Sequence, residues 1–162
     1  MRQDAHRIRC NGYRAVSEVD PASAQDLIAV RALLERAGLP TSDLESARPE
    51  FAVIREQGQV IAAGALQRFG SSALLRSLVV APERRGAGLG QAIVSELERV
   101  ARAGQISRLV LLTQTAADFF EHRGYSVIDR SSAPEQMQGS EEFRSLCPSS
   151  ATCMAKSLLE SA

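Results

Sequence analysis

A short glycine-rich stretch is the part of this sequence best suited to bind an anion. Residues 84–90 read RRGAGLG, so three glycines occupy alternate positions directly after two arginines. Glycine adopts positive φ readily and lets a ligand approach the backbone closely, because it has no Cβ. If a helix follows, its first N–H groups have no partner inside the helix and lie at the positive end of its dipole. The stretch therefore predicts a phosphate-binding cradle, to which the arginines add complementary charge.

The segments on either side predict a strand before the cradle and a helix after it. Leu74–Val80 is an apolar run stopped by Ala81-Pro82, which is typical of a buried strand. Leu89–Ala103 repeats apolar residues at helical spacing, which predicts an amphipathic helix of about four turns. The glycine spacing fits neither the dinucleotide fingerprint nor the P-loop. A tight turn in which the glycines serve only backbone geometry is the simpler alternative.

The rest of the chain predicts short strands and helices around these elements. A helix is expected over Ala24–Ala37, with Ser23 or Asp20 as its cap. Because the long helix connects Leu74–Val80 to the strand at Arg108–Thr113, these two strands should pair in parallel, while the three strands up to Val80 should form an antiparallel meander. The other predicted elements are an edge strand over Tyr13–Val19, a helical turn within 41–50, strands over 51–56 and 59–66, a short helix over 116–122, strands over 125–128 and 152–158, and a helical turn over 141–146.

Length and composition limit the class of protein. The 162 residues suit a single domain, expected over residues 13–162 after a flexible extension of residues 1–12. With 19 basic and 19 acidic residues and no Trp, the chain has neither the net charge nor the aromatic platform typical of nucleic-acid binding. Three cysteines and two histidines without metal-ligand spacing predict no metal site and a reducing, cytoplasmic compartment. No apolar run suits a membrane span or a secretory signal, so no membrane partner is expected.

Two motifs resemble those of the GNAT superfamily of acetyl-CoA-dependent N-acetyltransferases. Arg85, Gly88 and Gly90 match the superfamily pattern Q/R-x-x-G-x-G/A, and residues 116–125, AADFFEHRGY, look like its A-x-x-F-Y-E-x-x-G-F helix and turn. The resemblance implies an α/β (α+β) fold: a mixed, mostly antiparallel central sheet with one splayed parallel strand pair and helices on both faces. It also implies acetyl-CoA as co-substrate. A homodimer is common in this superfamily and is supported here by the resemblance alone.

The resemblance also assigns roles to individual positions. The backbone of Leu78 and Val80 would bind the pantetheine arm and the acetyl carbonyl, and an N–H group near Val79 or Val80 would hold the developing oxyanion. Phe120 stands where the superfamily often carries a tyrosine that protonates the leaving thiolate, and phenylalanine has no proton to give. Another group would protonate the thiolate, or water would. The residues expected at the coenzyme are Leu78, Val79, Val80, Arg85, Gly86, Ala87, Gly88, Leu89, Gly90, Gln91 and Phe120.

Two further stretches, Leu75–Leu78 and Glu142–Pro148, look like the arsenic-resistance branch of the superfamily. That branch is thought to acetylate the amino group of small arsenical or phosphinic amino acids. Arg76 and Arg144 would then clamp the carboxylate or oxyanion of the acceptor. The alternative for each arginine is a solvated charge on a strand or helix surface.

Acetyl transfer to an amine requires a group that removes the proton of the amine. Direct attack by the amine needs no enzyme nucleophile, although Cys147 leaves an acyl-enzyme open. Cys147 and Cys153 are expected to be small buried hydrophobes rather than ligands for trivalent arsenic. Two other functions stay open, a non-catalytic acyl-CoA-binding module and a protein N-acetyltransferase. The candidate bases, which the sequence does not rank, are Asp43, Glu45, Glu50 and Glu142.

Overall fold

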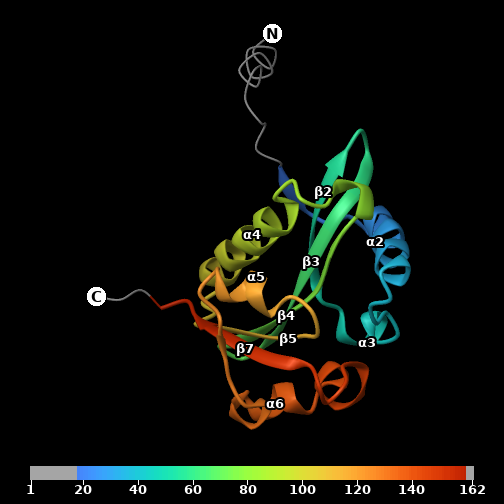
Figure 1. The fold of residues 1–162 in the computed structure, drawn as a ribbon. Helices are drawn as coiled ribbons and strands as arrows, with labels where there is room; N and C mark the ends of the chain where they lie inside the picture. The colour runs from blue at the N-terminus through green and yellow to red at the C-terminus, as the bar shows by residue number, and fades with distance from the viewer. Residues whose placement is uncertain (1–17, 160–162) are drawn as a thin grey trace.

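The computed structural model describes residues 18–159, in which seven strands form one mixed sheet (Figure 1). The strand order is β1-β2-β3-β4-β5-β7-β6. The strands are β1 (Val19–Pro21), β2 (Glu50–Glu56), β3 (Gln59–Phe69), β4 (Ser72–Val80), β5 (Arg108–Thr113), β6 (Ser126–Val127) and β7 (Thr152–Ser157). The helices are α2 (Ala24–Arg36), α3 (Leu44–Ala47), α4 (Leu89–Ala103), α5 (Ala117–Glu121) and α6 (Glu135–Gln138). Two 3₁₀ turns, at Pro82–Arg84 and Arg130–Ser132, and a π-helical turn at Glu142–Leu146 complete this part of the chain.

The pairing of the strands confirms the predicted fold class. β2, β3 and β4 form the expected antiparallel meander, and β4 and β5 pair in parallel. Parallel pairing joins Ser72–Leu74 to Arg108–Val110, although β4 continues to Val80 and β5 to Thr113. The two strands therefore part beyond Leu74, and the splayed parallel pair is confirmed.

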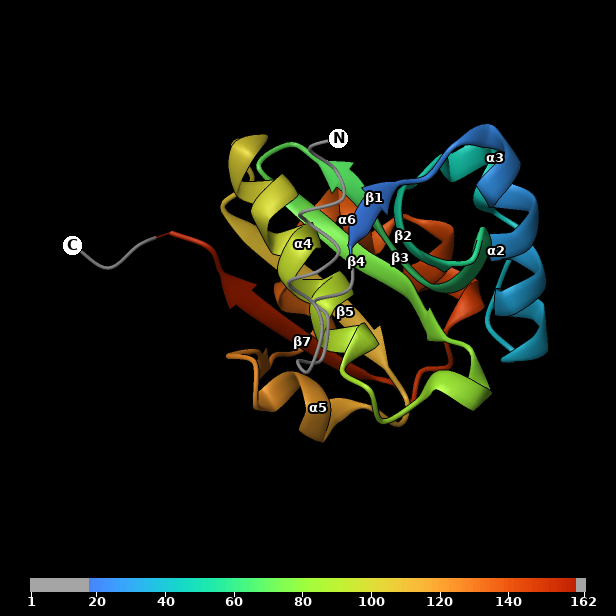
Figure 2. The same cartoon turned by 90° about the horizontal axis from the view of Figure 1, so that it is seen from above.

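Helices cover both faces of the sheet (Figures 1 and 2). α4 and α5 lie on one face, and α2 lies on the other. On the face of α2, α6 and the π-helical turn cover the part of the sheet that contains Leu74 and Val110. Val100 is half-buried, and the other apolar positions that α4 was predicted to bury against the sheet are buried, namely Leu89, Ile93, Val94, Leu97 and Ala101.

Local signals explain where α2 begins. The Ser23 hydroxyl accepts a hydrogen bond from the Asp26 N–H, and an Asp26 oxygen accepts one from the Ser23 N–H, which makes a capping box. The helix ends at Arg36, one residue before the predicted end. Asp26 also accepts two hydrogen bonds from Arg55 of β2, so the first turn of α2 is tied to the sheet.

Three elements differ from the prediction. β1 begins at Val19, and residues 13–17 of the predicted edge strand, like the predicted extension of residues 1–12, lie outside the described residues. β6 is only two residues long, because it pairs with β7 at two positions on the edge of the sheet. α6 was not predicted, because four residues are too few to show a helical period. Among residues 18–159, no helix combines the length and the apolar character needed to cross a bilayer.

Candidate active site

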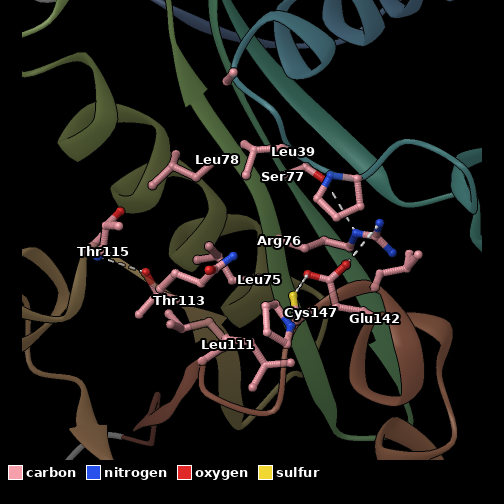
Figure 3. Close-up of a pocket in the computed structure, with 18 of the residues that line it drawn as sticks. Leu39, Leu75, Arg76, Ser77, Leu78, Leu111, Thr113, Thr115, Glu142 and Cys147 are labelled. Carbon is pink, nitrogen blue, oxygen red and sulfur yellow. Dashed lines mark hydrogen bonds and ion pairs between the residues drawn. The ribbon is translucent and has the colours of Figure 1, made fainter.

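The gap between β4 and β5 opens into a cavity of about 460 Å³ (Figure 3). One wall is Leu75–Leu78 of β4, and the opposite wall is Leu111–Ala116, from β5 and the loop after it. Two further segments close the cavity on the face of the sheet that α2 covers, namely the loop Ala37–Pro40 after α2 and residues 146–148. The cavity is therefore built where two parallel strands separate.

A β-bulge in β4 bends this strand at the cavity. Ala63 pairs with Val79 and Ala65 with Arg76, so two residues, Ser77 and Leu78, lie opposite the single residue between the two alanines. Ser77 has a φ of 59°, which a residue other than glycine rarely adopts. A bulge bends its strand and redirects the side chains that follow, which accounts for the separation of β4 from β5 at this point.

Gly64 makes room for the bulge. A Cβ at this position would lie 2.6 Å from Ile93 Cγ2 and 3.3 Å from Leu78 Cδ1. Both distances are shorter than an ordinary van der Waals contact. The absence of a side chain at Gly64 therefore lets α4 and the bulged strand approach β3.

The predicted phosphate cradle lies open at the start of α4. Gly86 and Gly88 have φ values of 85° and 82°, and a Cβ at either position would meet no atom within 4 Å. Gly88 is the N-cap of α4 and supplies no side-chain acceptor to the first turn. The N–H groups of that turn therefore have no partner within the helix. Exposed amides at the positive end of a 15-residue helix, next to the exposed Arg85, fit a diphosphate.

The cradle lies next to the end of β4, the strand that also lines the cavity. The Cβ that Gly90 lacks would lie 3.8 Å from Val80 Cγ2 and 3.6 Å from Phe119 Cζ, so the start of α4 touches both the end of β4 and α5.

The Arg123 guanidinium lies 3.8 Å from the centroid of the Phe119 ring and donates to Gln91 Oε1 at 3.1 Å. Sequence reasoning missed Arg123. Its spacing of four residues from Phe119 on a helical segment is the signal that could have identified the contact.

Two of the three aromatic residues of the second motif, Phe120 and Tyr125, lie in different environments. Phe120 is buried and lines the cavity, where it also packs edge-on against Tyr125. Tyr125 lies in the core and donates to Glu98 Oε2 at 2.9 Å. Burial, together with Glu98, raises the pKa of the Tyr125 hydroxyl far above its usual value. Tyr125 is therefore a core residue, and no tyrosine lies among the cavity-lining residues of the described chain.

Arg76 is neither a solvated charge nor a free anion clamp, so both sequence interpretations of it need correction. Its side chain is 0% exposed and donates to both carboxylate oxygens of Asp43, at 2.7 and 2.6 Å. It also donates to Gln67 Oε1 at 2.9 Å, and Glu142 Oε1 lies 3.3 Å from its Nη2 atom. The hydrogen bonds that an acceptor carboxylate would need are therefore largely taken within the protein. Arg144 is exposed and does not line the cavity, which agrees with the surface-charge alternative.

The structure separates the four candidate bases. Asp43 is buried behind Arg76, Glu45 is exposed outside the cavity, and Glu50 forms an ion pair with Arg68 at the surface. Glu142 is the only one of the four that lines the cavity. In Figure 3 it lies beside Arg76 and Cys147, away from Thr113 and Thr115.

Of the two cysteines expected to be small buried hydrophobes, only Cys153 agrees with that prediction. Cys153 is buried in the core under α6. Cys147 is half-buried, and its thiol donates to Glu142 Oε2 at 3.4 Å. Burial, followed by the negative charge of Glu142, raises the pKa of the Cys147 thiol to about 12. A thiol that stays protonated at neutral pH is a poor nucleophile, which disfavours an acyl-enzyme at Cys147.

A bulged, splayed strand pair with an anion cradle at its end defines the class of the protein, and the family comparison agrees. Residues 47–127 match the family described as Acetyltransferase (GNAT) domain. The chain therefore belongs to the GNAT acetyltransferase family. Enzymes of this family use acetyl-CoA as co-substrate, as predicted.

Curated relatives share about half of this chain. An amino-acid acetyltransferase from Pseudomonas fluorescens (strain Pf0-1) is 34% identical over 84 residues, which is 51% of this chain and 19% of the relative. An amino-acid acetyltransferase from Pseudomonas syringae pv. syringae is 36% identical over 91 residues, which is 54% of this chain and 21% of the relative. The chain thus spans about a fifth of the length of these relatives.

Solved structures share almost the whole fold. An N-acetylglutamate synthase from Neisseria gonorrhoeae, complexed with coenzyme A and N-acetyl-glutamate, has a TM-score of 0.78 at 22% identity, over 91% of this chain and 36% of that one. A Mycobacterium tuberculosis protein in complex with CoA and NLQ has a TM-score of 0.76 at 28% identity, over 88% of this chain and 99% of that one.

Proposed function

We propose that this protein transfers the acetyl group of acetyl-CoA to the primary amine of a small molecule. The observation that carries the proposal is that two features share β4: the start of α4, which lies against Val80 at the end of this strand, and the cavity between the parted strands β4 and β5. The first suits the diphosphate of the coenzyme, and the second suits a narrow thioester arm. Solved structures of the same fold that are complexed with coenzyme A support binding of the coenzyme.

Backbone groups are predicted to make most of the contacts to the coenzyme. Residues 85–91 would hold the diphosphate, and the backbone of Leu78 and Val80 would hold the pantetheine arm. An N–H group near Val79 or Val80 would stabilise the negative charge that develops on the acetyl oxygen. Since Phe120 has no proton to donate, the thiol would leave as the thiolate and take its proton from water.

Two observations bear on the acceptor. The curated relatives are named amino-acid acetyltransferases, which supports a free amino acid or a similar small amine. The two stretches that resemble the arsenic-resistance branch meet at the cavity, because Arg76 contacts Glu142 and both residues line it. The finer proposal, an arsenical or phosphinic amino acid, rests on the resemblance of these two stretches to that branch.

A thiol-release assay with acetyl-CoA tests the proposal. The panel contains simple amines, free amino acids, phosphinic and arsenical amino acids, and short peptides. Release with a free small amine or amino acid is expected. Tight CoA binding without release from any acceptor would support the non-catalytic binding module, and release with peptides alone would support a protein N-acetyltransferase.

The remaining expectations belong to the same proposal. We propose a single domain over residues 13–162 that works in the cytoplasm, consistent with the cysteine usage, and a homodimer, consistent with the superfamily. Sedimentation of the purified chain tests the dimer, and fractionation of its native cells tests the location.

A further inference from the structure

At the inner end of the cavity, on the α2 side of the sheet, the contacting group of Arg76, Asp43 and Glu142 carries one positive and two negative charges. Arg76 and Glu142 are the charged side chains among the lining residues of the described chain, and the bidentate contact with Asp43 already neutralises Arg76. Arg130 is a further cation nearby, and its positive charge partly opposes the rise in the pKa of the Cys147 thiol. Its N–H groups donate to the backbone carbonyls of Phe143 and Pro148. A ligand that enters the cavity therefore meets the negative charge of Glu142.

Glu142 keeps acceptor capacity toward the cavity. Its Oε2 atom accepts from the Cys147 thiol at 3.4 Å, and its Oε1 atom forms a 3.3 Å ion pair with Arg76 that is longer than either Arg76–Asp43 bond. A carboxylate offers about four acceptor positions, so about two remain. A buried carboxylate with unused positions is costly unless a donor reaches it, and a positively charged donor compensates it best.

Local structure fixes this carboxylate in place. Glu142 opens a π-helical turn, in which the Cys147 N–H donates to the Glu142 carbonyl at 3.1 Å. π-helical turns occur frequently at functional sites. Three segments far apart in the sequence meet here, because Asp43 and Arg76 come from the loop before α3 and from β4. Asp43 and Glu142 lie outside the 47–127 segment that matches the family, and Arg76 lies inside it.

Resting on the proposed acetyl transfer, we propose that Glu142 binds the ammonium group of the acceptor and removes its proton. The acceptor is then a small primary amine that enters as a cation. Arg76 and Asp43 position Glu142 and do not touch the amine.

The chemical step balances with these groups. The ammonium gives one proton to Glu142, and the free amine forms the C–N bond to the acetyl carbon while the C–S bond breaks. The nitrogen loses its second proton to water, and the leaving thiolate takes one proton from water, so these two transfers cancel. Glu142 returns its own proton to solvent. The products are the amide, CoA as the thiol and one released proton.

A binding experiment tests this role without requiring turnover. The probes are butylamine at pH 7, which is protonated, and butan-1-ol, its neutral counterpart, each titrated into the protein–CoA complex and followed by NMR. The wild-type complex should bind the ammonium in preference to the alcohol. E142Q keeps the size of the side chain but loses its charge, and should reduce that preference about ten- to hundredfold. CoA affinity should not change.

Two further variants control for structure. E141Q removes the exposed carboxylate one residue earlier and should keep the preference. E142D keeps the charge on a shorter side chain and should restore part of the preference, which a merely structural role of Glu142 would not require. Equal binding of the two probes by the wild type, or an unchanged preference in E142Q, would overturn the proposal. Thiol release by the wild type reports separately on the proposed acetyl transfer.

Discussion

Replacing Gly88 by alanine should weaken coenzyme binding without unfolding the protein. A Cβ at Gly88 would meet no protein atom within 4 Å, so the substitution causes no clash in the free protein. The φ of 82° is unfavourable for any residue with a Cβ, at a cost of about 1–2 kcal/mol. A domain with the usual stability of about 5–15 kcal/mol stays folded after such a loss. The new methyl group instead occupies the space from which a phosphate would approach the first amides of α4.

The hairpin turn between β2 and β3 provides a matched control for this strain. Gly58 has a φ of 79° and also has no atom within 4 Å of its missing Cβ. G58A and G88A should therefore lose similar stability in urea denaturation. Losing one charge-assisted hydrogen bond costs about 1.5–3 kcal/mol, so CoA affinity by calorimetry should fall at least about tenfold in G88A and stay at the wild-type value in G58A. If the two folded variants bound CoA equally well, the cradle would not hold the coenzyme.

Three further outcomes are expected. Because burial raises the pKa of the Cys147 thiol to about 12, iodoacetamide should alkylate it much more slowly at pH 8 than a free cysteine, as followed by mass spectrometry of its peptide. Replacing Arg76 by leucine leaves two buried carboxylates unpaired and should lower the free energy of unfolding by about 3–5 kcal/mol in urea, whereas a loss below about 1 kcal/mol would contradict the buried pair. Hydrogen bonds from Arg55 hold the pKa of Asp26 well below its usual value, so their stabilisation is complete above about pH 4 and is lost as the pH falls further. The urea midpoint should thus fall less between pH 6 and pH 3 in R55M than in the wild type.

Sequence reasoning succeeded where the signal was local. The helical spacing of Leu89, Ile93 and Leu97 identified the buried side of α4, and the glycines before it identified the turn at its start. Of the two predicted caps of α2, Ser23 or Asp20, Ser23 is the N-cap. In each case the deciding interactions lie within a few residues of one another.

The parts that sequence did not predict depend on contacts between distant residues. Asp43 and Glu142 were both predicted as candidate bases. Their contacts with Arg76 could not be predicted, because Arg76 is 33 residues from Asp43 and no local pattern links the three residues. The interpretation of Arg76 as a clamp for the acceptor considered its charge without its partners. The bulge at Ser77 was also missed, because it follows from the register of β4 against β3 rather than from a turn residue.

The most direct measurement is a crystal structure of the protein with CoA. The diphosphate should lie on the backbone amides of residues 88–90, and the thiol should lie between β4 and β5, next to Leu78 and Leu111. A diphosphate bound away from the start of α4, or a thiol outside the gap between the two strands, would contradict the proposed coenzyme site.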